Sequence, residues 1–290
     1  MQNVEALLEA LPFIKEFHGT TMVFKIGGHA MVNDEILEET VKDIILLQYI
    51  GIKPIVVHGG GPEISEKMEK LGLKPRFVEG LRVTDRETME VVEMVLDGKI
   101  NSKIVAMFIK NGGKAVGLSG KDGLLIVAEK KLMKMKKGLE EVIIDLGFVG
   151  EAKLVNPTIL RILLENGFIP VISPVSADLN GNLYNLNADS VAGDIASALK
   201  AKKLVILTDV PGILRDVKDK NSLISRIKLS ELRQLYEMGV LKGGMLPKFE
   251  AIAKALEGGV EKVHIIDGSR KHAILLELFT REGIGTMVEL

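Results

Sequence analysis

The sequence predicts an α/β fold built on a largely parallel sheet. Short segments rich in Val, Ile and Leu alternate along the chain with amphipathic helical patterns, which is the order that parallel strands and crossover helices produce. Glycines directly follow several of these segments, as at Gly27-Gly28 and Gly59-Gly60-Gly61. The 290 residues, of which 47% are hydrophobic, suffice for one large domain or for two lobes.

The first half of the chain opens with a predicted helix over 4–17. Apolar residues from Val4 to Phe17 recur there at helical spacing, and Pro12 is a point where the helix would kink. Buried strands that end in glycines then alternate with amphipathic helices. In chain order these elements are a strand at 21–26, a helix at 35–50, a strand at 53–58, a helix that begins at Pro62 and a helix at 86–96.

An antiparallel section interrupts the alternation. Segments 124–129, 142–148 and 153–155 have the pattern of antiparallel strands, and 130–137 between them holds five lysines in eight residues. We interpret the lysine-rich segment as a solvated hairpin tip, with anion binding as the alternative.

The remaining elements return to the parallel pattern, with a soft boundary near residue 200 between the earlier and the later units. No Pro/Ser-rich linker and no obvious repeat divides the chain. The predicted strands are 114–118, 169–172, 203–207 and 262–266, and the predicted helices are 189–200 and 247–257.

Composition excludes several classes of function. The 38 basic and 39 acidic side chains leave a net charge of −1, which predicts no binding to nucleic acid or to an anionic membrane. The absence of cysteine excludes disulfides, thiolate metal sites and thiol nucleophiles. The N-terminus lacks the pattern of a signal peptide, and no apolar run reaches the roughly 18–20 residues needed to span a bilayer. We expect a cytoplasmic protein.

Glycines at the ends of strands are the first candidate site. Ligands bind at the carboxyl ends of parallel strands, and glycine lets backbone N–H groups approach an anion there. Lys25 precedes Gly27-Gly28, and Pro62 starts a helix directly after Gly59-Gly60-Gly61. Neither run is a P-loop or a dinucleotide fingerprint. A tight turn explains the glycines alone, whereas the adjacent lysine favours a site for phosphoryl transfer.

Three further segments place polar residues before predicted helices or after strands. Asn187 or Asp189 is suited to cap the helix at 189–200, but a cap does not explain the cluster with Asn185. Lys248 lies in the first turn of a helix, an unfavourable position for a cation without an anionic partner. Asp209, in the turn at 207–212, is either structural or orients a nucleotide or a lysine.

Six motifs occur in the order found in the amino-acid kinase family, which the chain resembles over about residues 20–290. The third is most similar to the branch that phosphorylates N-acetylglutamate. The motifs are Lys25-x-Gly27-Gly28, His58-Gly59-Gly60-Gly61-Pro62, Gly80-Leu81-Arg82-Val83-Thr84-Asp85, Asn185-x-Asn187-Ala188-Asp189, the segment 207–212, and Gly243-Gly244-Met245-Leu246-Pro247-Lys248.

The resemblance implies a three-layer αβα sandwich in two lobes, 1–200 for the acyl amino acid and oligomerisation and 201–290 for the nucleotide. It implies ATP-dependent phosphorylation of the side-chain carboxylate of N-acetyl-L-glutamate, the second step of arginine biosynthesis. Magnesium would arrive mainly on the phosphates of ATP, with no metal ligands from the protein.

The resemblance also implies roles for individual residues. Lys25 and Lys248 would stabilise charge on the transferring phosphoryl group, and Asp189 would hold both lysines in position. Arg82 would bind the α-carboxylate of the substrate and Asn185 its backbone-like end. The remaining roles are backbone N–H donation to phosphates and carboxylate by Gly27, Gly28, Gly60 and Gly61, and ATP contacts by Lys25, Gly27, Gly28, Thr208, Asp209, Gly212 and Lys248.

No general base is needed for this chemistry, because a carboxylate acceptor is already ionised at neutral pH. We therefore interpret His58 as structural rather than as a base. His29, after Gly27-Gly28, departs from the small or amide residue usual in this branch, which leaves the contacts on the phosphate side open.

The ends of the chain resemble members of the family that form hexamers and are inhibited by L-arginine. The helix within 1–18 would interlace dimers into a hexamer, a trimer of dimers. His272, Glu277 and Gly283 would form the effector site, with Glu277 binding the cation of arginine.

Three alternatives compete with this interpretation. One is a related kinase for carrier-linked aminoadipate or glutamate, aspartate or UMP, against which the segment Gly80 to Asp85 argues. Another is a non-catalytic arginine sensor, which would be expected to have lost Lys25, Asp189 or Lys248. A dinucleotide-dependent dehydrogenase is disfavoured because its fingerprint is missing.

Overall fold

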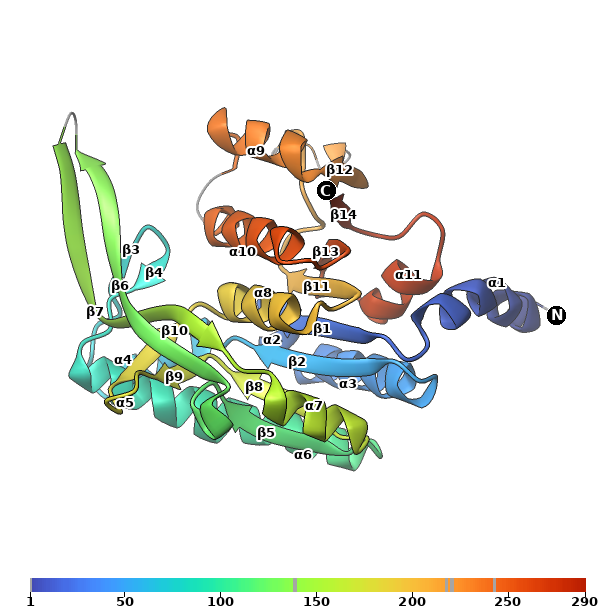
Figure 1. Ribbon diagram of the computed structural model, residues 1–290, viewed down its shortest axis with the longest axis horizontal. Coiled ribbons are helices and arrows are strands. Elements are labelled where there is room, and N and C mark those ends of the chain that lie inside the picture. The colour runs from blue at the N-terminus through green and yellow to red at the C-terminus, as the bar shows by residue number, and fades with distance from the viewer. Residues whose placement is uncertain (1, 138–139, 217–218, 220–221, 242–243) are drawn as a thin grey trace.

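The computed structural model describes residues 2–290 apart from 138–139, 217–218, 220–221 and 242–243. Its centre is an eight-stranded sheet in the order β12-β14-β13-β11-β1-β2-β8-β5 (Figure 1). Neighbouring strands are parallel except β13 and β14. In spatial order the strands are Arg226–Lys228, Thr286–Glu289, Lys262–Asp267, Lys203–Thr208, Thr21–Ile26, Lys53–His58, Ile169–Ser173 and Ala115–Ser119.

Helices cover both faces of this sheet, which confirms the predicted three-layer α/β architecture. Side chains alternate between the two faces of a strand, so that Phe24 of β1 joins one buried core and Val23 the other. The first core includes α3 (Asp34–Tyr49), α6 (Asn101–Lys110) and α11 (Ala273–Phe279), and the second includes α7 (Thr158–Glu165), α8 (Ala188–Leu199) and α10 (Met245–Glu257).

The strand order reverses at β1. From β1 the chain first builds β2, β5 and β8 on one side, and it later adds β11, β13, β14 and β12 on the other side. In an open parallel sheet such a switch point leaves a crevice outside the carboxyl ends of the strands. The register pairs Lys25 with Val57 of β2 and Ile206 of β11, so Lys25 lies near that end of the sheet.

A small closed barrel stands beside the main sheet. It consists of β6 (Ile126–Lys137), β7 (Glu140–Val155), β9 (Val175–Ala177) and β10 (Leu183–Leu186). The hairpin of β6 and β7 extends from the body at the upper left of Figure 1, and α1 (Gln2–Phe17) lies at the opposite end. Helix α1 continues through Pro12 without a break.

The hairpin strands are longer than predicted. Segments 142–148 and 153–155 belong to the single strand β7, and the lysine-rich segment 130–137 lies within β6 rather than at a tip. Lys130 pairs with Asp145. Register shifts near Val127/Ala128 and Lys130/Leu132 let β6 bend within the hairpin. The turn at 138–139 lies outside the described residues.

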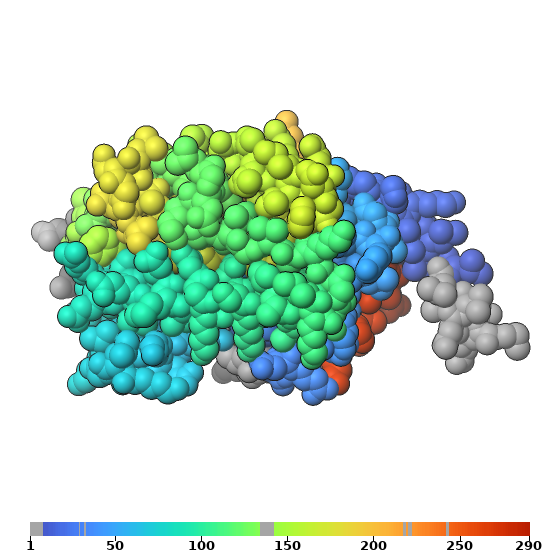
Figure 2. Space-filling model, turned by 90° about the horizontal axis from the view of Figure 1, so that it is seen from below, coloured from blue at the N-terminus to red at the C-terminus, as the bar shows by residue number. Residues whose placement is uncertain are grey.

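One long helical run was predicted only at its start. Helix α5 (Arg86–Glu93) continues as the π-helix η1 (Met94–Ile100) and then as α6. Figure 2 shows the run, in teal to green, crossing the face seen from below. The other elements are α2 (His29–Val32), α4 (Gly61–Lys70), β3 (Phe77–Val78), β4 (Leu81–Arg82), η2 (Asp122–Leu124) and α9 (Leu229–Glu237). Within the described part of the chain, no helix has the length and apolarity required to cross a bilayer.

Candidate active site

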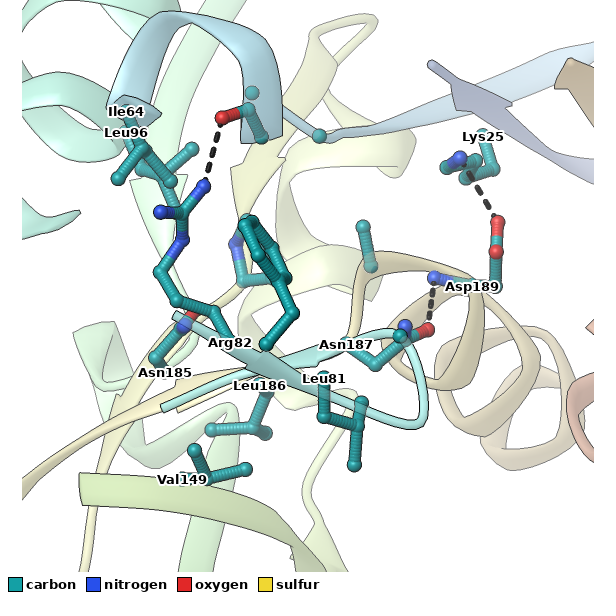
Figure 3. Close-up of a pocket in the computed structure, with 17 residues that line it drawn as sticks. Lys25, Ile64, Leu81, Arg82, Leu96, Val149, Asn185, Leu186, Asn187 and Asp189 are labelled. Atoms are coloured by element: carbon teal, nitrogen blue, oxygen red, sulfur yellow. Dashed lines mark hydrogen bonds and ion pairs between the residues drawn. The ribbon is translucent and has the colours of Figure 1, made fainter. Parts of the chain in front are cut away.

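Two lysines face one buried carboxylate at the carboxyl end of the sheet. Lys25 Nζ lies 2.9 Å from Asp189 Oδ1, and Lys248 Nζ lies 2.9 Å from Asp189 Oδ2. The three residues come from β1, the start of α8 and the first turn of α10. Residues separated by more than 200 positions thus meet at one carboxylate, and Figure 3 shows the contact of Lys25 with Asp189.

The lysines keep Asp189 ionised although it is only 5% exposed. Burial alone raises the pKa of this carboxyl, but the nearby charges of Lys25 and Lys248 outweigh burial and lower the pKa to about 2. Two cations around one anion leave a net positive charge. An additional anion, such as a phosphoryl group, would be attracted to this end of the sheet.

The start of α8 places Asp189. Asn187 is the N-cap, and its Oδ1 accepts hydrogen bonds from the backbone N of Asp189 at 2.9 Å and of Ser190 at 3.1 Å. Asp189 lies in the first turn, where the positive end of the helix favours a carboxylate. Lys248 occupies the corresponding region of α10, where a cation is disfavoured, and Asp189 supplies the opposite charge.

Gly27 and Gly28 allow side chains to pack against the turn after β1. A Cβ at Gly27 would lie 2.2 Å from Lys25 Nζ. A Cβ at Gly28, whose φ is +61°, would lie 2.0 Å from Asp209 Oδ1. The first glycine therefore leaves room for the lysine that contacts Asp189. Gly28 allows Asp209, in the loop after β11, to pack against the loop after β1.

The turn after β2 presents free backbone donors. Gly59 N donates to Ile26 O at 3.0 Å, whereas the N–H groups of Gly60 and Gly61 meet no protein acceptor in the described residues. Gly60 precedes α4, so these N–H groups are at the positive end of a helix. This arrangement can bind an anionic oxygen.

Lys25, Asp189 and this glycine turn line one pocket of about 200 Å³. Figure 3 shows Arg82 and Asn185 on one side of the pocket and Lys25 with Asp189 on the other, with Leu81 and Val149 below. The pocket is lined by Lys25, Gly59, Gly60, Gly61, Ile64, Phe77, Gly80, Leu81, Arg82, Leu96, Val149, Pro174, Asn185, Leu186, Asn187, Ala188 and Asp189. It therefore has cationic groups at two ends and apolar walls between them.

Arg82 is a buried cation that has no carboxylate partner among the residues the structure describes. Its Nη2 donates to Gly61 O and to Ser65 Oγ, both at 2.8 Å, and its guanidinium lies 4.6 Å from the ring centroid of Phe77. Burial lowers the pKa of Arg82 from its ordinary value. Nη1 donates to Met68 Sδ at 3.3 Å. A carboxylate in the pocket would therefore bind through Nε or through the second N–H of Nη1.

Asn185 lies on β10 beside Arg82. Its Nδ2 donates to Thr84 Oγ1 at 3.3 Å, and Thr84 Oγ1 in turn donates to Arg82 O at 3.0 Å. Asn185 lines the pocket, and its amide oxygen is available there to accept a hydrogen bond from a ligand N–H group.

Of the residues predicted to contact the nucleotide, Lys25 lines this pocket, whereas the others lie outside it, in the turns after β1 and β11 and at the start of α10. Thr208 is the last residue of β11, and Asp209 packs against Gly28. Gly212 packs closely on β14, because a Cβ there would lie 2.5 Å from Thr286 Oγ1. Lys248 is also outside the pocket and reaches it through Asp189. Gly243 lies outside the described residues.

The predicted effector residues separate into two groups. Glu277 is 8% exposed, and its Oε2 accepts hydrogen bonds from the backbone N of Ile284 at 2.7 Å and of Gly285 at 3.0 Å. Gly283 adjoins this carboxylate. His272 instead contacts α3, with Nδ1 2.7 Å from Asp43 Oδ1.

The other carboxylate oxygen of Glu277 is also occupied. Glu277 Oε1 lies 2.6 Å from His264 Nδ1, and His264 Nε2 lies 2.9 Å from Lys203 Nζ. A bound cation would therefore have to share Glu277 with His264.

His58 is buried in the protein interior and is not exposed to the pocket. Burial lowers its pKa to about 4, so the imidazole is neutral at neutral pH. The structural interpretation of His58 is thereby supported. His29 begins α2, but its side chain lies outside what the structure describes.

Several residues that shape the pocket were missed from the sequence. Ser65 and Phe77 hold Arg82, and Leu96 contributes from the π-helix. The helical spacing of Ser65 four residues after Gly61 was a usable signal, because both contact Arg82 from α4. No sequence pattern indicated that the helix around Leu96 has π geometry.

Residues 20–267 match the amino acid kinase family, and the chain belongs to this family. Two relatives of known name indicate which kind of protein in this family the chain resembles. The chain is 76% identical over 289 residues to the acetylglutamate kinase of Archaeoglobus fulgidus, with 100% of both chains covered. It is 57% identical over 290 residues to the acetylglutamate kinase of Methanocaldococcus jannaschii, covering 99% of this chain and 96% of that protein. The chain is therefore a kinase.

Solved structures share its fold. An N-acetylglutamate synthase from Neisseria gonorrhoeae, complexed with coenzyme A and N-acetyl-glutamate, superposes with a TM-score of 0.85 at 28% identity. The comparison covers 99% of this chain, which spans 63% of the length of that protein. A carbamate kinase from Giardia lamblia bound to AMP-PNP has a TM-score of 0.63 at 16% identity, with 93% of this chain and 98% of that one covered. The second likeness concerns the fold alone.

Proposed function

We propose that the chain transfers the γ-phosphoryl group of ATP to the side-chain carboxylate of N-acetyl-L-glutamate. A carboxylate oxygen forms a bond to the γ-phosphorus as the bond to the β,γ-bridging oxygen breaks, which yields an acyl phosphate and ADP. The placement of Lys25 and Lys248 on either side of Asp189 carries the proposal, because two positioned ammonium groups stabilise charge on a transferring phosphoryl group. The relatives named acetylglutamate kinase support the choice of substrate.

The acyl amino acid would occupy the pocket of about 200 Å³. Arg82 would bind its α-carboxylate, Asn185 its acylated end, and the N–H groups of Gly60 and Gly61 the reacting carboxylate. Arg82 is buried and has no carboxylate partner in the described part of the chain, which supports this orientation, since a ligand carboxylate would compensate its charge. Arg82 and Lys25 lie on opposite sides of the pocket (Figure 3), so the side chain of a substrate bound at Arg82 would extend toward the lysine.

ATP would bind across the ends of β1 and β11, contacting Gly27, Gly28, Thr208, Asp209 and Gly212. The strands after residue 200 all lie on this side of β1, which supports the division into an acyl amino acid lobe, 1–200, and a nucleotide lobe, 201–290.

Magnesium would be carried by the phosphates of ATP. Asp189 is not placed to bind the metal ion, because each of its two oxygens faces a lysine. The described residues contain no group of three or more His, Cys, Asp or Glu side chains placed to hold a metal ion.

Trapping the acyl phosphate with hydroxylamine tests the proposal. Purified protein with Mg-ATP should form a hydroxamate from N-acetylglutamate and not from glutamate or aspartate, which lack the N-acyl group, nor from N-acetylaspartate, whose side chain is one methylene shorter. UMP, which has no carboxylate to form a hydroxamate, should release no ADP. Product from another acceptor alone would assign the related kinase activity. ATP binding without any product would favour a sensor, although Lys25, Asp189 and Lys248 are all present.

We further propose that the kinase is a hexamer, a trimer of dimers, that is inhibited by L-arginine at Glu277 and Gly283, with His272 nearby. This second proposal rests on the resemblance of the ends of the chain to arginine-inhibited members of the family. A bound cation would share the Glu277 carboxylate with His264 and with two backbone N–H groups. Removal of residues 1–18 should reduce the assembly to dimers, seen by light scattering, and weaken the arginine response. An unchanged hexamer with an unchanged response would contradict this second proposal.

A further inference from the structure

His58 makes two hydrogen bonds beneath the glycine turn. Its Nδ1 lies 2.9 Å from Gly59 O, and its Nε2 lies 3.2 Å from Asn101 Nδ2. His58 is fully buried, and Asn101 is 6% exposed. Neither side chain lines the pocket, whereas Gly59 and Gly60 do. The pair therefore supports the turn from the side opposite the pocket.

The contacts of Asn101 determine which imidazole nitrogen carries the proton. Asn101 Nδ2 also lies 2.9 Å from Val171 O and 3.3 Å from Leu118 O. Carbonyl oxygens only accept hydrogen bonds, so this atom is the NH2 group and acts as a donor. His58 Nε2 must then be the unprotonated acceptor. The proton is on Nδ1, which donates to Gly59 O.

This hydrogen bond orients a peptide group of the active site. In a trans peptide the C=O and the following N–H point in opposite directions. Because Gly59 O is held toward His58, the N–H of Gly60 points away from the imidazole and toward the pocket. That N–H meets no acceptor in the part of the chain that is described, so it remains available to a bound anion.

The π-helix closes the other side of the turn. A Cβ at Gly60 would lie 2.3 Å from Ile100 Cδ1 and 2.7 Å from Leu96 Cδ2. Asn101 directly follows η1, so the same helical segment packs against Gly60 and presents the amide that orients His58. Isolated π-helical turns of this kind occur frequently at functional sites.

We propose that His58 and Asn101 are positioning residues for phosphoryl transfer, which together aim the Gly60 N–H at the anionic group in the pocket. The inference rests on the proposed function for the identity of that group. His58 does not act as a base, since both ring nitrogens are hydrogen-bonded within the protein and the ring does not reach the pocket. A purely structural role would predict altered stability with an unaltered kcat.

Two substitutions of His58 separate these roles. The amide nitrogen of asparagine can take the place of Nδ1 as donor to Gly59 O, whereas leucine fills similar space without a donor. We expect His58→Leu to lower kcat for acyl phosphate formation on the order of 100-fold, as for a misdirected transition-state donor. His58→Asn should recover most of this loss, with the KM for ATP unchanged in both. Equal kcat values in the two variants, or a kcat of His58→Leu within twofold of the unmodified enzyme, would overturn the proposal.

The tautomer of His58 provides a test that needs neither a variant nor turnover. Nitrogen-15 NMR of histidine-labelled enzyme should show His58 with a protonated Nδ1 and an unprotonated Nε2. In Asn101→Asp the carboxylate accepts from Nε2, so Nε2 should become protonated as well while Nδ1 still donates to Gly59 O. The opposite tautomer in the unmodified protein would overturn the proposal. This measurement requires no substrate. It can therefore contradict the positioning role of His58 even if N-acetylglutamate is not the substrate.

Discussion

At the scale of single residues, Asp189 is the group on which the site depends. It is buried, and each of its two oxygens faces a different lysine at 2.9 Å. Loss of its charge would leave Lys25 and Lys248 close together without compensation, an arrangement that costs several kcal/mol for buried ions. The residue thus contributes to folding as well as to the positions of both cations.

The depressed pKa of Asp189 predicts a specific loss of stability in acid. Its folded pKa of about 2 lies below the value of roughly 3.9 for an unfolded aspartate. Its contribution is therefore complete above about pH 4 and is lost as the pH falls toward 2. Urea titrations from pH 5 to 2 should show a smaller decrease in the free energy of unfolding for Asp189→Asn than for the unmodified protein.

Asp194, buried on the same helix and paired with Lys254, is the control for this prediction. Burial raises its pKa, in spite of the lysine, so its ionised form does not add stability in this range. Asp194→Asn should retain the full decrease in acid. Parallel pH profiles for the unmodified protein and Asp189→Asn would contradict the assignment.

Partners of single residues could be predicted where the neighbouring sequence indicated them. A lysine beside glycines, and a lysine in a first helical turn, both indicated anionic partners before any partner was known. The neighbours of Arg82 could not be predicted in the same way. Phe77 and Ser65 come from a short ribbon and from α4, and only the folded chain brings them to the guanidinium.

At the scale of elements, the packing of α8 against α10 fixes the distance between Asp189 and Lys248. The helices approach closely at Gly193, where a Cβ would lie 2.8 Å from the backbone oxygen of Ala251. A side chain at this position would push the helices apart, since a backbone oxygen cannot turn away as a flexible side chain does.

Gly193→Ala should therefore destabilise the protein by about 1–3 kcal/mol, the usual cost of overpacking, and should lower activity by separating Asp189 from Lys248. Gly98→Ala is the matched control, because Gly98 is also helical and its Cβ would meet no atom within 4 Å. The control should be neutral or up to about 1 kcal/mol more stable. Urea unfolding measures both, and equal stabilities of the two variants would contradict the close-packing argument.

Periodicity predicted the parallel strands closely and the other elements less well. The strands at 21–26 and 53–58 have the predicted bounds, because continuous apolar runs end there in glycine. Strand β7 appeared as two fragments, because residues 149–152 between them include Gly150, and glycine has a low preference for strands. Short elements such as β12 and β14 form only by pairing with distant strands.

At the scale of the whole molecule, the reversal of strand order at β1 explains why the site lies where it does. The turns after β1, β2 and β11 all open at the same end of the sheet, and α8 and α10 begin there. Ligands bound on the two sides of β1 would meet at Lys25. The sequence predicted this α/β arrangement, but the small barrel beside it depends on long-range pairings that periodicity does not show.

The most direct test of the proposed chemistry is the rate of acyl phosphate formation in a rapid-quench experiment with saturating Mg-ATP and N-acetylglutamate. Lys25→Arg and Lys248→Arg should each lower this rate by about 10²–10³-fold, because a planar guanidinium cannot replace a compact ammonium between Asp189 and the phosphoryl group. Lys254→Arg, on the same helix as Lys248 but paired with Asp194, should remain within about twofold. Near-normal rates in Lys25→Arg and Lys248→Arg would contradict phosphoryl transfer between these two lysines.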